Sequence, residues 1–246
     1  MTRTTLLLAA VCLCVIRSDL LSAQRASPGR VVFDQGHGEL PPPAQMDAIA
    51  KKLGLEIRTS AEPITAATLT GARVLYLRAP SKEFTAPETE AIVSFVKGGG
   101  ALLLVLDEER RQSLEKTAVN NLISPFGMRL TPDTKYLHNT GGVAKAGEIN
   151  KADRQVPFSG GRAVEGGSPF AFQLDRDGNL AQPFGAYERL DSGGRIVVLG
   201  EGMASLFMGE RAGVRLSGDN NNPRTTTYWG KDSAIFMEEV LSWLAR

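Results

Sequence analysis

Residues 85–106 describe a helix followed at once by a buried strand, and this pair of elements most limits how the chain can fold. Thr85-Ala86-Pro87-Glu88 is a capping box with proline in the first turn, so a helix should begin here. Gly98-Gly99-Gly100 ends that helix, and residues 101–106 form a continuous apolar run of the kind found in central strands. The pair predicts a parallel sheet whose two faces are covered by helices.

The same alternation of short β-branched runs and amphipathic stretches recurs along most of the chain, which is the pattern of an α/β protein. The closing helix should bury Ile235, Phe236, Val240, Leu241 and either Trp243 or Leu244. Further strands are expected over 30–34, 55–58, 74–77 and 195–199, a helical turn over 64–69, and helices over 44–53, 114–123 and 233–244.

The segment from about 128 to 190 has a different composition and residue pattern, with glycines, turn dipeptides and short alternating runs. Such a composition favours β-hairpins or an irregular insertion over further strand-helix units. Its expected strands are 170–174 and 186–190, and Asp175-Arg176-Asp177-Gly178-Asn179 is expected to be a hairpin turn. We therefore expect an irregular β-rich insertion within an otherwise regular α/β domain.

The first 23 residues have the layout of a secretory signal peptide. Arg3 precedes an apolar stretch over 6–16, and Leu21-Ser22-Ala23 supplies small residues for cleavage. The apolar stretch is about half the roughly 20 residues that a membrane-spanning helix needs. The sequence thus predicts a secreted or periplasmic protein that starts near Gln24, has no stable membrane anchor after cleavage, and forms a single domain over 24–246.

Loss of this segment would change the chemistry available to the protein. Cys12 and Cys14 are the only cysteines, so the mature chain would have no disulfide and no thiol nucleophile. It would also be formally neutral, because Arg3, Arg17 and Asp19 leave with the segment. Since no basic stripe with interleaved aromatic residues is present, nucleic acid is an unexpected partner.

Polar residues follow the apolar runs at three expected strand ends, where side chains of an open α/β sheet converge on a crevice. Asp34, His37 and Glu201 are the candidate catalytic residues because carboxylates and histidine transfer protons near neutral pH. The opposing interpretation is that carboxylates at strand ends cap helices or lie in solvated loops. The candidate ligand-binding residues at these ends are Gln35, Gly36, Gly38, Glu39, Asp107 and Glu108.

A second group of candidate ligand-binding residues lies in the polar segment 219–229. Asn221 and Arg224 supply hydrogen-bonding groups, and Tyr228 with Trp229 supply aromatic rings of the kind that recognise sugars or polar peptides. An ordered surface loop with packed aromatic residues would explain the same sequence. No cofactor is expected, and two histidines, His37 and His138, are too few to favour a transition-metal site.

Four stretches together resemble a known domain. The domain is shared by gliding-motility GldG-type proteins, intraflagellar transport proteins and uncharacterised bacterial secreted proteins, and has the class I glutamine amidotransferase-like fold. The resemblance covers about 30–130 and 195–246, and implies a flavodoxin-like three-layer sandwich with a mainly parallel central sheet. The stretches are Val31-Val32-Phe33-Asp34-Gln35-Gly36-His37-Gly38, Phe84-Thr85-Ala86-Pro87-Glu88, residues 95–104 and residues 194–202.

The sequence departs from true amidotransferases at their nucleophile, so glutamine amidotransferase activity is not expected. Their nucleophile is a cysteine on a glycine-flanked turn after a strand, whereas the corresponding Val105-Leu106-Asp107-Glu108 has neither cysteine nor glycine. The favoured interpretation is a secreted, non-catalytic domain that binds a small polar ligand, a carbohydrate or a protein partner. The alternative is a hydrolase of carbohydrates or related polar substrates, in which Asp34 or Glu201 activates water and His37 transfers the proton.

Overall fold

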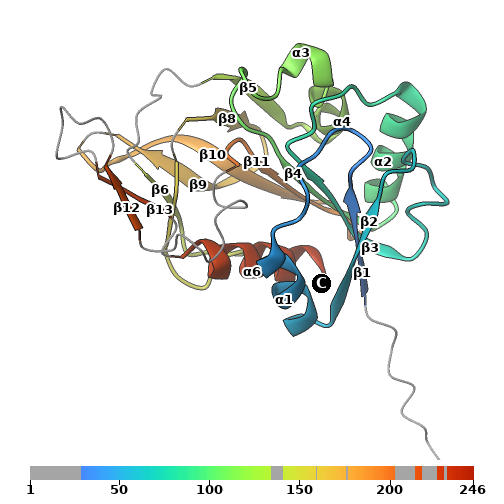
Figure 1. Cartoon of the computed structure of the whole chain (residues 1–246), viewed down its shortest axis with the longest axis horizontal. Coiled ribbons are helices and arrows are strands. Elements are labelled where there is room, and N and C mark those ends of the chain that lie inside the picture. The colour runs from blue at the N-terminus through green and yellow to red at the C-terminus, as the bar shows by residue number, and fades with distance from the viewer. Residues whose placement is uncertain are drawn as a thin grey trace, which may run out of the picture.

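The structure is a computed structural model, shown in Figure 1. The predicted signal peptide, His138, Asn221 and Arg224 lie outside the residues it describes, and the side chains of Tyr228 and Trp229 do as well. Among the described residues, no helix is long and apolar enough to cross a membrane. The described residues are 29–133, 141–158, 160–175, 177–202, 214–217, 226–229 and 232–246.

A nine-stranded mixed sheet forms the centre of the described fold. Five neighbouring strands are parallel: β2 (Leu55–Ser60), β1 (Gly29–Asp34), β3 (Ala72–Arg78), β4 (Ala101–Val105) and β11 (Arg195–Leu199). Four antiparallel strands continue from β11: β10 (Leu180–Arg189), β9 (Ser168–Leu174), β6 (Gly142–Ala144) and β7 (Arg154–Val156). Small two-stranded sheets are made by β5 (Arg129–Asp133) with β8 (Arg162–Glu165) and by β12 (Val214–Ser217) with β13 (Thr226–Trp229).

This topology confirms the mixed α/β class and corrects the nature of the insertion. The predicted strand over 170–174 lies within β9 and that over 186–190 overlaps the end of β10, and Asp175 N–H donates to the Asn179 carbonyl between the two strands. Four strands of this segment, β6, β7, β9 and β10, continue the same sheet in antiparallel pairing, which agrees with the β-hairpin alternative and not with an irregular insertion. Its strands carry weak signals because β6 and β7 are only three residues long. The flavodoxin-like assignment stays a prediction.

Helices cover both faces of the parallel strands (Figure 1). On one face α1 (Ala44–Lys52) and α6 (Ser233–Leu244) pack on the odd-numbered β1 residues Val31 and Phe33. On the other face α2 (Ala86–Lys97) and α4 (Asn120–Ile123) pack on Val32 and its neighbours. Because side chains of a strand alternate between faces, one buried strand serves both layers of the core.

The helix ends follow their capping signals. Thr85 and Glu88 form the predicted capping box of α2, with Glu88 Oε2 accepting from the Thr85 backbone N–H at 3.0 Å. The helix expected over 114–123 is instead two pieces, α3 (Leu114–Thr117) and α4, followed by the short η1 (Ser124–Phe126). Ala118 breaks it in the left-handed conformation, with φ of 52°.

The closing helix α6 has the predicted bounds but not all of the predicted buried face. Ile235 is 41% exposed, so its expected burial was wrong, whereas Trp243 and Leu244 are both buried. The buried stripe instead includes Met237 beside Phe236, one turn before Val240 and Leu241. The other predicted residues are buried as expected, and α6 packs against β7 and β11 as well as α1.

A charged cluster fixes α6 to the antiparallel end of the sheet. Glu239 accepts hydrogen bonds from Arg154 Nη2 at 2.6 Å and from Asn150 Nδ2 at 3.1 Å. Burial by itself would raise the pKa of Glu239, but the hydrogen bonds from Arg154 and Asn150 outweigh it and lower the pKa. The carboxylate is therefore charged and holds β7 on the helix.

We expect Glu239→Ala to lower the free energy of unfolding by about 2–3 kcal/mol, because it leaves the largely buried Arg154 without a partner. Glu238→Ala is the matched control, since Glu238 pairs with the exposed Lys52 and should cost less than about 1 kcal/mol. Urea unfolding of the two variants measures the difference. Equal midpoints would show that the cluster does not hold the helix.

Candidate functional site

A pocket of about 180 Å³ opens where the parallel strands end. It lies at the carboxyl edge of the sheet, the place where crevices form in open α/β sheets. Its walls come from the loops that follow β1, β3, β4 and β11, so it unites segments that are far apart in the sequence. The lining residues are Gly38, Leu40, Arg78, Ala79, Ser81, Val105, Asp107, Arg111, Gln112 and Gly202.

His37 is held on both ring nitrogens by carboxylates. Its Nδ1 lies 2.6 Å from Asp34 Oδ2, and its Nε2 lies 3.4 Å from Glu88 Oε2. The imidazole also stacks on Phe84, with ring centroids 4.0 Å apart, and only 6% of the residue is exposed. The arrangement ties the loop after β1 to the start of α2.

The charges in this cluster support one another. Burial by itself would lower the pKa of His37, but the hydrogen bond and charge of Asp34, with those of Glu88, raise it. Burial likewise opposes ionisation of Glu88, yet hydrogen bonds from Thr85 and Ile64 and the His37 charge lower its pKa to about 2. A protonated His37 between two carboxylates is the expected state at mildly acidic pH.

Glu39 carries a proton in the same cluster. Burial, the hydrogen bond to Asp34 and the Asp34 charge raise the pKa of Glu39 to about 9. Its Oε2 accepts from the His37 backbone N–H at 2.9 Å, while no donor faces Oε1 among the described residues. Burial by itself would raise the pKa of Asp34, but the hydrogen bonds with His37 and Glu39 outweigh it and lower the pKa.

Asp34, His37 and Glu39 offer three ligand atoms within 4.8 Å of one another, which is close enough for a metal ion. A shared proton explains this spacing as well, because the 2.6 Å contact of His37 with Asp34 is a hydrogen-bond length. The expectation that the chain holds no metal stays a prediction.

The glycines beside His37 face other loops of the same chain. At Gly38, which has φ of +76°, a Cβ would lie 2.3 Å from Ser81 Oγ, and at Gly36 one would lie 3.3 Å from the Ala61 carbonyl. Ser81 N–H also donates to the His37 carbonyl at 2.8 Å. The close backbone approach that these glycines permit is therefore made by neighbouring loops.

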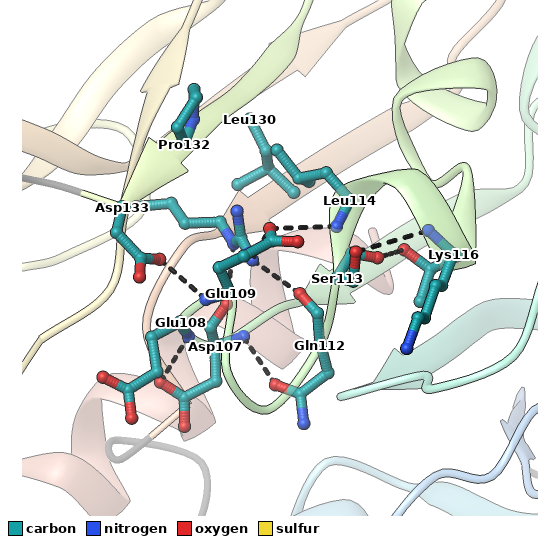
Figure 2. A network of polar contacts seen from close by, with 12 residues as sticks. Asp107, Glu108, Glu109, Gln112, Ser113, Leu114, Lys116, Leu130, Pro132 and Asp133 are labelled. Carbon is teal, nitrogen blue, oxygen red and sulfur yellow. Dashed lines mark hydrogen bonds and ion pairs between the residues drawn. The ribbon is translucent and has the colours of Figure 1, made fainter.

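Arg162 organises the loop that follows β4, and it was not among the residues predicted from the sequence. Its side chain is fully buried; Nε donates to the Asp107 carbonyl at 2.7 Å and Nη2 to the Gln112 carbonyl at 2.5 Å. Figure 2 shows two further contacts of this loop: the Gln112 side chain accepts from Asp107 N–H within the loop, and Asp133 at the end of β5 accepts from Glu109 N–H.

The predicted acidic residues of this loop are themselves in contact with arginines. Asp107 Oδ2 lies 3.6 Å from Arg111 Nη1, and Glu108 pairs with Arg110 and Arg111. Burial raises the pKa of Asp107 despite hydrogen bonding from the Glu108 N–H and the Arg111 charge. Glu201 is fully buried next to Gly202, which lines the same pocket as Asp107.

The structure thus brings the predicted residues into two groups. Asp34, His37 and Glu39 form one hydrogen-bonded cluster, and Asp107 and Glu108 belong to the loop after β4. The sequence does not identify two central residues: it indicates Glu88 only as part of a capping box, and Arg162 lies in the segment expected to be irregular. A lone arginine in a short strand carries no sequence signal of burial.

We expect Glu39→Gln to alter the pH dependence of stability. Since burial raises the pKa of Glu39 from 4.5 to about 9, the favourable contribution of its protonated form is complete below pH 4.5 and is lost as the pH rises toward 9. The amide mimics the protonated acid, so the variant should match the native protein at pH 4 and exceed its unfolding free energy by at least about 1 kcal/mol at pH 8. Parallel pH profiles in urea titrations would contradict the assignment.

We expect Arg162→Met to cost about 3 kcal/mol of unfolding free energy, because it removes the donor to three backbone carbonyls and the ion-pair partner of Glu109. Trypsin should also cut faster after Arg110 and Arg111 as the loop loosens. Arg129→Met is the control, since Arg129 forms an exposed pair and should change little. Unchanged proteolysis would show that the loop is held by other contacts.

Comparison with known proteins gives a consistent match over the first part of the domain. Residues 30–166 match the IFT52 GIFT domain. The mouse intraflagellar transport protein 52 homolog is 27% identical over 144 residues, which are 53% of this chain and 32% of that protein. The human homolog is 26% identical over 144 residues, 53% of this chain and 31% of that protein. The chain spans about a third of the length of these relatives.

Solved structures agree on the fold. The mmIFT52 N-terminal domain has a TM-score of 0.54 at 20% identity, over 70% of this chain and 86% of that domain. A putative GMP synthase component from Thermoplasma acidophilum has a TM-score of 0.50 at 9% identity, over 88% of this chain and 94% of that protein. At these identities the likeness concerns the fold alone.

These matches correct three predictions made from the sequence. The relatives are named for intraflagellar transport, which contradicts a secreted or periplasmic location and gives no support to a signal peptide at 1–23. They equally contradict a secreted ligand-binding protein or a carbohydrate hydrolase. The part of the predicted resemblance that named intraflagellar transport proteins is confirmed, and the chain belongs to the IFT52 GIFT domain family.

Proposed function

We propose that this chain is a non-catalytic protein-interaction domain that acts within an assembly of the intraflagellar transport type. Its family and its relatives' names support this choice. The proposal concerns the domain only, since the chain spans about a third of those relatives. We also propose that the domain is related to that of GldG-type proteins and that its sheet is of the flavodoxin-like type.

The observation that carries the proposal is that the strand-end polar residues are engaged with the fold. Both ring nitrogens of His37 contact carboxylates, those of Asp34 and Glu88, and Arg162 donates hydrogen bonds to the loop after β4. A catalytic acid or base must instead reach a substrate proton. We infer that Asp34 and His37 are positioning residues that hold loops, and that the strand ends form a rigid surface.

One part of this surface has the composition of an interface. Leu40 is 50% exposed, and the Arg111 side chain is 43% exposed; together with the exposed Ser81 they border the strand-end pocket. We call these three residues the crevice rim. Arginine and apolar side chains at a small pocket are typical of the anchoring points in protein–protein interfaces. The crevice rim is the proposed docking surface for a protein partner.

The test is site-specific photo-crosslinking of the full chain in its native cells. A photoreactive amino acid at Leu40 should give one discrete protein adduct, and Arg111→Glu in the same chain should lower its yield about tenfold by reversing the charge beside the anchor. Leu180, which is 49% exposed on the β9–β10 hairpin, is the matched control position.

Two results would contradict the proposal. One is the same set of adducts at Leu40 and Leu180, which would indicate random collision. The other is an adduct at Leu40 whose yield is unaffected by Arg111→Glu, since the crevice rim would then not be the docking surface.

A further inference from the structure

The strand β2 ends the sheet on its parallel side. Among the described strands it pairs only with β1, and Glu56, Arg58 and Thr59 are exposed on it. An uncovered edge of this kind presents backbone donors and acceptors to any further strand.

The backbone direction of β2 is fixed by one hydrogen bond. Gln35 N–H donates to the Ser60 carbonyl at 2.8 Å, so the Ser60 carbonyl points toward the loop after β1. Backbone groups of successive strand residues point alternately to the two sides. Those of Glu56 and Arg58 therefore point inward like Ser60, and those of Leu55, Ile57 and Thr59 point to the open edge.

The side chains of β2 alternate between the two faces of the sheet. Leu55 and Ile57 pack with the core that α1 and α6 cover, so Glu56 and Arg58 stand together on the opposite face. Neither Glu56 nor Arg58 has an ion-pair partner among the described residues. The neighbouring Arg30 is engaged elsewhere, since its Nη1 donates to the Thr70 carbonyl at 3.1 Å.

We propose that a second copy of this chain pairs antiparallel along β2, with the two-fold axis at Ile57. In that register Ile57 faces Ile57 of the other copy as a hydrogen-bonded pair, because its N–H and carbonyl point outward. Glu56 then faces Arg58 of the other copy, and Arg58 faces Glu56. The strand is thus self-complementary in charge.

The register also brings the charges close. Glu56 and Arg58 point their backbone groups inward, so they occupy non-hydrogen-bonded pairs, where facing Cα atoms are only about 4.5 Å apart. Opposite charges at directly facing positions stabilise a strand pair, and like charges destabilise it. The two copies join their sheets into one continuous sheet across the axis.

The test measures the dimerisation constant of the full chain by sedimentation equilibrium. Glu56→Arg should weaken dimerisation about tenfold or more, because symmetry turns one substitution into two facing arginine pairs. Arg58→Glu should do the same through facing carboxylates. The double variant Glu56→Arg with Arg58→Glu should recover the native constant, since the charges are exchanged but remain complementary.

A backbone variant tests the edge independently of charge. Ile57→Pro removes an outward N–H and should abolish dimerisation while the thermal unfolding midpoint changes little, as proline is tolerated at open strand edges. Glu90→Arg, an exposed change on α2, is the control and should leave the constant unchanged.

A native chain that is monomeric at all concentrations would overturn the proposal, and the charged residues of β2 would then serve only to keep the edge from pairing. Failure of the double variant to recover dimerisation would overturn the register. Both results are separate from the proposed function, because crosslinking at Leu40 concerns the crevice rim and not β2.

Discussion

The parallel strands end together, and the loops that leave them carry backbone groups that the sheet no longer pairs. A buried N–H or carbonyl without a partner costs about 1–3 kcal/mol, so each loop must bring its own donors and acceptors. Glu88 accepts from two backbone N–H groups, Glu39 from one, and Arg162 donates to the carbonyls that hold the loop after β4. The edge of the sheet therefore depends on buried ionisable side chains.

Buried charge in turn requires compensation, which explains why these residues occur in groups. A protonated His37 contacts both Asp34 and Glu88 and offsets one of their two negative charges, and Glu39 keeps its proton rather than add a third. The resulting cluster looks like a catalytic constellation when only the residue types are read. Its geometry instead joins the loop after β1 to the capping box of α2. Glu88 both caps the helix and contacts His37.

Much of the fold could be predicted because its signals are local. The capping box at Thr85, the glycines after α2 and the apolar run of β4 are each complete within a few residues, and the structure places them as expected. The place of the strand-end pocket also follows from topology alone. Contacts between residues far apart in the sequence could not be predicted. Glu88 contacts His37 only because β1 and β3 are neighbours in the sheet. Arg162 is buried only because β8 lies beside the loop after β4.

The two ends of the sheet show why surface function is harder to read than the core. At one end α6 and β13 contact β7, and the buried Glu239 holds the helix there, so that edge belongs to the fold. At the other end β2 combines a half-buried isoleucine with two exposed opposite charges. Alternation of this kind reads from sequence as an ordinary half-buried strand. Only its position as the last strand gives the Glu56 and Arg58 pair a role between copies, because a charge pattern on an inner strand would have no second edge to face.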